Sequence, residues 1–193
     1  MKYAVVNLGC KVNRVESDAF ASSLDARGGQ KVEACDADLI VVNTCTVTGE
    51  AEKKTRKAVR QALRANERAT VVVTGCAAAI DKDTFLKMDP RVRVMGKAEV
   101  SSSIEAGAWG LDSAAHGSAL PVGEGYRTRV GVKVQDGCNN ACTYCIVHVA
   151  RGKAHSMPVR DVVSQCRTLA SAGVKEIVLT GINLGSYRWQ DAE

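Results

Sequence analysis

Short apolar runs alternate with stretches of helical periodicity along the first hundred residues. The apolar runs are Lys2–Leu8, Ala37–Asn43, Ala69–Thr74 and Val92–Met95. Between them, Asn13–Arg27 carries apolar residues at helical spacing, and a longer helical stretch runs from Gly49 to about Asn66. Strands that alternate with helices imply βαβ crossovers and a parallel sheet covered on both faces. The sequence therefore predicts an α/β fold for this part of the chain.

The pattern changes between Ser101 and Tyr126, where Gly, Ser and Ala dominate and no period is visible. Such a stretch is typical of a linker or a long loop. Beyond it, Arg129–Gln135 predicts a strand, Pro158–Ala172 an amphipathic helix, and Lys175–Thr180 a second strand of the parallel type. We therefore predict a domain over residues 1–104, a linker over 105–127 and a second domain over 128–193.

Composition narrows the class of protein. The chain has 46% hydrophobic and 24% charged residues, which indicates a globular protein. No apolar run reaches the roughly 18 residues of a membrane span, and the N-terminus lacks the features of a signal peptide, so a cytoplasmic location is expected. There the eight cysteines would stay reduced and favour metal binding or catalysis over disulfides. The net charge of +5 permits a nucleic-acid partner.

Three cysteines follow the predicted strand Arg129–Gln135 at CxxxCxxC spacing: Cys138, Cys142 and Cys145. Three thiolates on one loop can hold a four-iron cluster and leave one iron without a protein ligand, open to a cosubstrate. This spacing is the signature of radical S-adenosylmethionine (SAM) enzymes. The alternative is a zinc site, in which His148 would supply the fourth ligand.

A second set of cysteines is dispersed along the chain. Cys10, Cys45 and Cys76 each follow one of the first three apolar runs. Because the carboxyl ends of parallel strands lie along one edge of a sheet, these cysteines are expected to meet there and to hold a second cluster. The alternative is that each is a small core residue. Cys35 and Cys166 lack this context, and we predict core packing for both.

The long helix from Gly49 also carries a basic stripe. Its members are Lys53, Lys57, Arg60, Arg64 and Arg68, which lie opposite Thr55, Ala58, Val59 and Ala62. A solvated helix face explains such a stripe, and a surface that contacts phosphates is the alternative interpretation.

Several motifs resemble those of the radical SAM methylthiotransferase family in the same order. They are LGCKVNRVES, VVNTCTVTGEAEKKTRK, VVVTGCAAA, KVQDGCNNACTYCIVHVARG and LTGINLGSY. The resemblance implies an N-terminal Rossmann- or flavodoxin-like domain followed by the start of a radical SAM (β/α) partial barrel. Cys10–Asn13 and Thr44–Thr48 are most similar to the MtaB branch, which methylthiolates N6-threonylcarbamoyladenosine next to the tRNA anticodon. The MiaB and RimO branches act on isopentenyladenosine and on a ribosomal-protein aspartate.

The resemblance also implies cofactors and partners. It assigns Cys138, Cys142 and Cys145 to the [4Fe-4S] cluster that cleaves S-adenosyl-L-methionine, and Cys10, Cys45 and Cys76 to a second [4Fe-4S] cluster that carries the transferred sulfur. Tyr144 is expected beside the adenine of the cosubstrate, with a core or capping role as the alternative. Asn183 is expected to make a polar contact to S-adenosylmethionine, with a turn role as the alternative. The implied partners are tRNA and an electron donor of the flavodoxin or ferredoxin type.

The chain departs from the family pattern in three places. After Ala150–Gly152 the family's further arginines are replaced by Lys153–Pro158, and Ala77 stands where an aromatic residue commonly follows the cysteine. Family members also continue beyond the point matching Glu193 through more barrel strands and an RNA-binding β-domain. We therefore expect either a fragment of a longer enzyme or a truncated iron–sulfur module without catalysis. A zinc-stabilised interaction domain is a third hypothesis.

Overall fold

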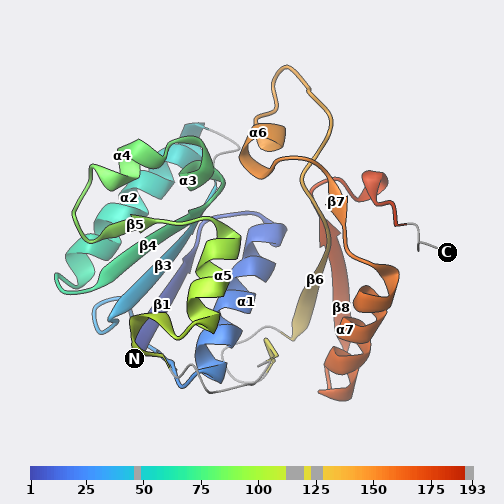
Figure 1. Ribbon diagram of the computed structural model, residues 1–193, viewed down its shortest axis with the longest axis horizontal. Coiled ribbons are helices and arrows are strands. Elements are labelled where there is room, and N and C mark those ends of the chain that lie inside the picture. The colour runs from blue at the N-terminus through green and yellow to red at the C-terminus, as the bar shows by residue number, and fades with distance from the viewer. Residues whose placement is uncertain (46–48, 112–119, 123–127, 190–193) are drawn as a thin grey trace. The chain divides into compact units, whose positions relative to one another are not determined.

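The computed structural model describes residues 1–45, 49–111, 120–122 and 128–189, and the chain divides into two compact units, Met1–Ala119 and Leu120–Glu193 (Figure 1). The division falls within the predicted linker, most of which lies outside the described residues. Of the helices that can be described, none is long and apolar enough to cross a membrane.

The first unit contains a parallel sheet with helices on both faces. Its elements are β1 (Lys2–Asn7), α1 (Lys11–Ala26), β2 (Gln30–Lys31), β3 (Leu39–Thr44), α2 (Gly49–Ala65), β4 (Thr70–Gly75), α3 (Cys76–Ile80), α4 (Lys82–Leu86), β5 (Val92–Val94), α5 (Lys97–Glu105) and the 3-10 helix η1 (Ala108–Gly110). The strand order is β2-β1-β3-β4-β5, and every pairing is parallel. This is the flavodoxin-like order, so the predicted α/β fold of this domain is confirmed.

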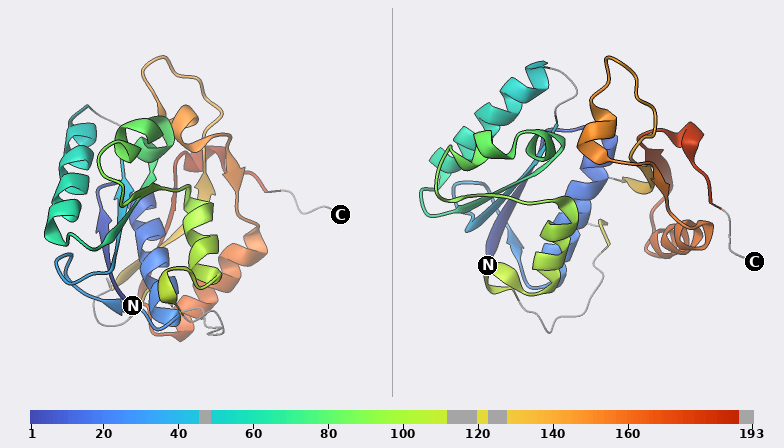
Figure 2. Two further views of the ribbon diagram at one scale, coloured as in Figure 1. Left: turned by 60° about the vertical axis from the view of Figure 1, so that its left-hand side comes forward. Right: turned by 45° about the horizontal axis from the view of Figure 1, so that its top comes forward.

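Both faces of this sheet are buried, as the continuous apolar runs predicted. On one face Val42 and Val73 belong to a core that includes Val59 of α2 and Phe85 of α4. The opposite face is covered by α1 and α5, which lie side by side (Figures 1 and 2). All six residues of β3 are buried, which makes this strand the centre of the unit.

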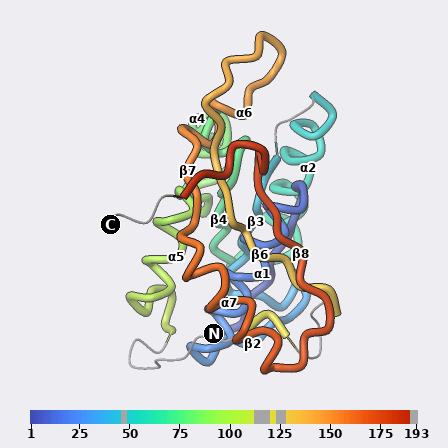
Figure 3. The backbone as a smooth tube through the Cα atoms, turned by 90° about the vertical axis from the view of Figure 1, so that its right-hand side faces the viewer, coloured from blue at the N-terminus to red at the C-terminus, as the bar shows by residue number. Residues whose placement is uncertain are grey.

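The second unit is smaller. It contains β6 (Arg129–Asp136), α6 (Val147–Arg151), β7 (His155–Ser156), α7 (Val159–Ser171), β8 (Glu176–Gly181) and the 3-10 helix η2 (Leu184–Ser186). The sheet order is β7-β6-β8, with β8 parallel to β6 and β7 antiparallel to it. Figure 3 traces β6 and β8 side by side. Val130, Val132, Val134 and Leu169 form its buried core.

The structure corrects several expectations. Ser101–Glu105 belongs to α5 and not to a linker, because Val100 and Ile104 give this helix a buried side that its many serines conceal in the sequence. Helix α2 ends at Ala65, so Arg68 lies in the following turn and is not part of a helical stripe. The predicted core position of Cys35 is wrong, because this residue is exposed. Cys166 is partly buried and packs against the core of the second unit.

Candidate functional site

The first three candidate cysteines lie at the carboxyl edge of the first sheet. Cys10 immediately precedes α1, shortly after β1; Cys45 directly follows β3, and Cys76 is the first residue of α3 directly after β4. Strands β1, β3 and β4 are neighbours and end nearly in register, since Asn7 pairs with Asn43. Cys45 and Cys76 are 7% and 4% exposed, whereas Cys10 is open to solvent.

A buried pair of amides supports this edge. Asn13 and Asn43 are both fully buried. The Nδ2 atom of Asn13 donates to Asn43 Oδ1 at 3.0 Å and to the carbonyl of Thr44 at 2.9 Å. In return, Asn43 Nδ2 donates to the carbonyl of Asn13 at 2.9 Å and to Ser17 Oγ at 3.1 Å. Because buried amides are costly unless hydrogen-bonded, these contacts lock α1 to the end of β3.

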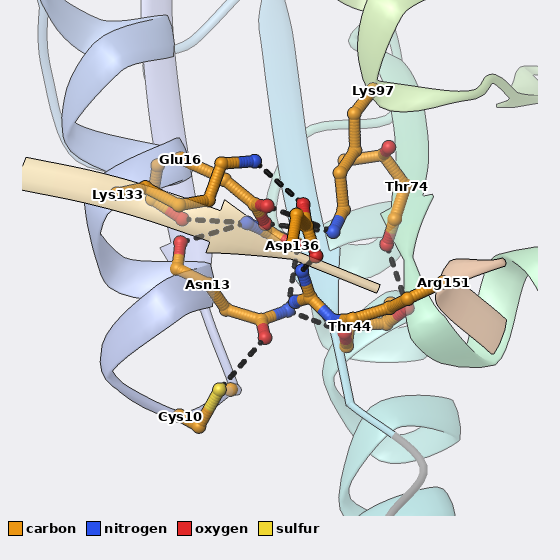
Figure 4. A network of polar contacts seen from close by, with 12 residues as sticks. Cys10, Asn13, Glu16, Thr44, Thr74, Lys97, Lys133, Asp136 and Arg151 are labelled. Atoms are coloured by element: carbon orange, nitrogen blue, oxygen red, sulfur yellow. Dashed lines mark hydrogen bonds and ion pairs between the residues drawn. The ribbon is translucent and has the colours of Figure 1, made fainter. Parts of the chain in front are cut away.

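The same amide pair reaches the first cysteine. The thiol of Cys10 donates to Asn13 Oδ1 at 3.3 Å (Figure 4). Gly9 leaves room for this contact, because a Cβ atom there would lie 2.2 Å from Asn13 Cγ. Asn13 therefore orients the Cys10 side chain with respect to the ends of the neighbouring strands.

Threonine hydroxyls anchor the segments that carry Cys45 and Cys76. Thr55 Oγ1 of α2 donates to the carbonyl of Cys45 at 3.1 Å. Thr44 Oγ1 donates to the carbonyl of Thr74 at 2.6 Å and accepts from the backbone nitrogen of Ala78 at 3.2 Å. These bonds tie the second turn of α2 to Cys45 and the start of α3 to the ends of β3 and β4.

The second set of cysteines belongs to the second unit, in a loop whose base is closed by an ion pair. Asp136, the last residue of β6, accepts from Arg151 NH1 at 2.8 Å through Oδ1 and from Lys133 Nζ at 2.7 Å through Oδ2 (Figure 4). The Arg151 side chain is 2% exposed. Burial raises the pKa of Asp136, but the hydrogen bonds and charges of Lys133 and Arg151 outweigh this effect and hold the pKa well below the usual aspartate range.

Backbone contacts close the loop further. Gly137 has φ +70°, and a Cβ atom there would lie 2.0 Å from the carbonyl oxygen of Lys153. The backbone nitrogen of Cys138 donates to the carbonyl of Gly152 at 3.1 Å, and that of Ala154 donates to Asn139 Oδ1 at 2.9 Å. Only glycine allows the two ends of the loop to approach so closely.

Within the loop, Cys142 is exposed and Cys138 and Cys145 are partly buried. Tyr144 is 91% exposed, so the alternative that its ring packs in the core is wrong. The Nδ1 atom of His148 is buried and has no hydrogen-bond partner within the described residues.

Asn183 precedes η2 and takes part in a turn. Its backbone nitrogen donates to Gln135 Oε1 at 2.8 Å, and its carbonyl accepts from Ser186 Oγ at 2.7 Å. These contacts support the turn role, and the contact of its side chain to S-adenosylmethionine stays a prediction.

The donor sets match an iron–sulfur protein. Both triads consist of free thiols, the ligands that iron–sulfur clusters take. The structure brings the three segments of each triad to one place, at a sheet edge and in a loop. Across the described residues, however, no three His, Cys, Asp or Glu side chains are arranged as a closed metal-binding group. The assignment of the six cysteines to clusters therefore stays a prediction.

Sequence reasoning missed the residues that support both sites. Asn43 and Thr44 interrupt the apolar run of β3 just before Cys45, and a polar pair at the end of a buried strand is the signal that could have revealed them. Likewise, Asp136 and Arg151 flank the cysteine loop as residues of opposite charge.

Two family models match the chain, one in each unit. The model described as "Uncharacterized protein family UPF0004" matches residues 2–96, and the model of the radical SAM superfamily matches residues 132–188. The radical SAM match implies a 4Fe–4S cluster and S-adenosylmethionine.

Curated relatives match along nearly the whole chain. The threonylcarbamoyladenosine tRNA methylthiotransferase MtaB of Chlamydia pneumoniae is 37% identical over 96% of this chain and 44% of its own length. The protein of that name from Aquifex aeolicus is 35% identical over 98% of this chain and 50% of its own length. The tRNA-2-methylthio-N(6)-dimethylallyladenosine synthase of Lawsonia intracellularis is 32% identical over 96% of this chain and 46% of its own length. The chain thus spans about half the length of these relatives.

Proposed function

Because the chain belongs to the radical SAM methylthiotransferase family, we propose that the protein methylthiolates tRNA at C2 of N6-threonylcarbamoyladenosine next to the anticodon. One observation carries the proposal. Two cysteine triads, one after β6 and one at the ends of β1, β3 and β4, occur in a chain that matches enzymes of that name along nearly its whole length.

In the net reaction a methylthio group replaces the hydrogen on C2 of the adenine. The C–H bond breaks and a C–S bond forms, so that a sulfur atom and a methyl group must be supplied. The hydrogen atom must also be removed, and the 5′-deoxyadenosyl group of a cleaved S-adenosylmethionine would accept it. Two [4Fe-4S] clusters and two molecules of S-adenosylmethionine, when bound, would supply the one-electron sulfonium cleavage, the sulfur and the methyl group.

The residues of the chain bind and orient these groups. Cys138, Cys142 and Cys145 would hold one cluster with an iron left open for the cosubstrate. The exposed ring of Tyr144 is free to stack on the adenine of S-adenosylmethionine, and the Asp136–Arg151 ion pair holds the base of the loop.

The first unit would hold the second cluster. Cys10, Cys45 and Cys76 would bind it at the carboxyl edge of the sheet. The buried Asn13 and Asn43 keep the backbone of that edge in register. Support for this assignment comes from the position of all three cysteines at neighbouring strand ends.

Iron content tests the cofactor assignment. Anaerobic reconstitution of the chain is expected to give about eight irons and as many acid-labile sulfides, which corresponds to two four-iron clusters. A content of about four would mean that one triad alone assembles. Tight binding of a single zinc without iron would support the zinc-stabilised domain.

Product analysis tests the substrate. The reconstituted protein is incubated with S-adenosylmethionine, a reductant and tRNA that carries either threonylcarbamoyladenosine or dimethylallyladenosine, and the nucleosides are analysed by mass spectrometry. We expect methylthiolation of the first. Product on the second nucleoside would support the activity for which the Lawsonia relative is named. In a parallel incubation with the ribosomal protein, product on its aspartate while neither tRNA reacts would overturn the tRNA assignment. Clusters without S-adenosylmethionine cleavage would indicate a non-catalytic iron–sulfur module.

A further inference from the structure

We propose that one exposed face of α2 binds the phosphate backbone of the RNA substrate. This face, the α2 basic face, consists of Lys53, Lys57, Arg60 and Arg64, all of which are exposed. The proposal rests on the proposed function, because it names the surface of the first unit that would hold the tRNA.

The four side chains share one side of the helix. Their spacings of four, three and four residues match the helical repeat, and Lys53 to Arg64 spans about 16 Å along the axis at about 1.5 Å per residue. The opposite side of α2 carries the buried residues Thr55, Val59, Ala62 and Leu63, which pack on the sheet. The α2 basic face therefore points away from the core over its whole length.

The acidic residues of α2 do not neutralise this face. Glu50 forms an ion pair with Lys54 at 2.9 Å, and Glu52 forms one with Arg56. Both carboxylates therefore pair with basic residues that do not belong to the α2 basic face. In the part of the chain that the structure describes, no ion pair involves Lys53, Lys57, Arg60 or Arg64. Among the described residues, none of the four charges is therefore taken up in an ion pair, although the carboxylates of Glu67 and Asp89 line the same surface hollow as Arg60 and Arg64, with Asp89 paired to Arg91.

Helix stability does not account for this arrangement. Like charges three or four residues apart destabilise a helix, and the face contains three such neighbouring pairs in a row. A polyanion bound along the face would remove the repulsion. Bound RNA would therefore stabilise α2, which an ordinary solvated face of alternating charges would not require.

The composition and position of the face favour RNA over an acidic protein. Helix α2 contains no aromatic residue, whereas protein–protein interfaces are enriched in aromatic side chains. Phosphate binding needs only the charges. Helix α2 begins shortly after Cys45, at the same sheet edge as the candidate cluster ligands, and runs away from that edge. An RNA with its target base at this edge can lay its backbone along the face.

The salt dependence of RNA binding tests the proposal. A fluorescently labelled anticodon stem–loop RNA is titrated with the 193-residue chain over a range of salt concentrations, and the logarithm of the binding constant is plotted against that of the salt concentration. Each lost phosphate contact lowers the slope by about 0.7 to 0.9. The double variant Lys57→Gln/Arg64→Gln is expected to lower the slope by about 1.5.

A matched control separates the face from net charge. Arg167→Gln/Lys175→Gln removes the same charge from two exposed residues of the second unit and is expected to leave the slope unchanged. Circular dichroism verifies that both variants keep their helices. Equal slopes for wild type and the α2 variant would overturn the α2 assignment while leaving the tRNA substrate intact, because RNA would still bind. If polyglutamate displaces the RNA from wild type and shows the same dependence on Lys57 and Arg64, the face binds acidic protein and the proposal is wrong.

Discussion

Each unit carries three cysteines, but the two units hold them by different means. In the first unit, Cys10, Cys45 and Cys76 come from distant parts of the sequence and lie at one sheet edge only because three parallel strands end there. The contacts beneath them are neutral amide and hydroxyl hydrogen bonds. In the second unit the cysteines occupy one short loop, and a buried ion pair closes its base.

This difference indicates what each site depends on. A site assembled from three strand ends requires the whole sheet to be folded, so its metal affinity and the stability of the first unit are coupled. A site within one loop requires only that the base of the loop stays closed. The two sites should therefore fail independently and in response to different substitutions.

The largest effect is expected from the replacement of a proposed cluster ligand in the loop, Cys142. Cys142→Ala is expected to abolish cleavage of S-adenosylmethionine and to lower the iron content from about eight to about four per chain, because one of two four-iron clusters is lost. Iron analysis and a cleavage assay measure both. Cys35→Ala removes an exposed thiol outside both triads and serves as the control. Loss of all iron in Cys142→Ala would contradict the independence of the two sites.

The second-largest effect is expected from removal of the Asp136–Arg151 ion pair at the base of the loop. Arg151→Ala leaves the buried carboxylate of Asp136 with one cation, Lys133, and the backbone N–H of Gly137, and is expected to destabilise the second unit by about 3 kcal/mol. Urea unfolding followed through Trp189, in a Trp109→Phe background, measures the change. The control Arg160→Ala breaks a surface pair with Asp161, for which we expect less than about 0.5 kcal/mol. An equal loss of unfolding free energy in the two variants would mean that the Asp136–Arg151 ion pair stabilises the unit no more than a surface ion pair does.

The third-largest effect is expected from loss of the hydrogen bonds between Asn13 and Asn43 in the first unit. Asn13→Ala leaves Asn43 Oδ1 and the Thr44 carbonyl without this donor, and we expect a loss of about 2 kcal/mol from the first unit. Unfolding is followed through Trp109 in a Trp189→Phe background. The iron content is expected to fall to about four per chain, with the loop cluster retained.

A matched control lies on the same helix. Ser22 is buried, and its hydroxyl has no hydrogen-bond partner within the described residues. Ser22→Ala should therefore leave both stability and iron content nearly unchanged. A loss of the loop cluster in Asn13→Ala would show that the two sites are coupled.

The smallest effect is expected at the exposed ring of the loop. Tyr144→Leu should change the free energy of unfolding by less than about 0.5 kcal/mol, since the side chain packs against little. It should weaken S-adenosylmethionine binding about tenfold through the loss of stacking. Calorimetric titration of the reconstituted chain measures the affinity, with Val149→Ala as an exposed control on α6. Unchanged affinity would exclude Tyr144 from the cosubstrate site.

The long elements could be predicted because their patterns are strong. The short runs of β-branched residues in β3 and β4 favour buried strands, and the apolar spacing of α2 matches a helix. The fold class alone did not give the order of the sheet, because the Rossmann and flavodoxin-like alternatives differ in strand order and the structure has the second of them. Short elements escaped prediction, because β2 and β7 have two residues each and are defined by their partners rather than by their own sequence.

The candidate cysteines could be predicted from their spacing, but the residues whose hydrogen bonds hold the neighbouring backbone could not. The bond between Asn13 and Asn43 joins residues that are far apart along the chain, and only the pairing of β1 with β3 brings them together. The closure at Gly137 likewise depends on the backbone of Lys153, which has no sequence signature.

The three cysteines of the first triad differ in exposure, so their rates of chemical labelling report on local opening of this sheet edge. A thiol-alkylating reagent reaches Cys10 directly, whereas Cys45 and Cys76 lie beneath the surface and react only when the strand ends open. The lag between the labelling of Cys10 and that of the two buried thiols therefore measures the free energy of opening this edge. If the proposed cluster assignment holds, a metal delivered from solution would meet the same order, with Cys10 as its first point of attachment and the buried pair as the later ligands.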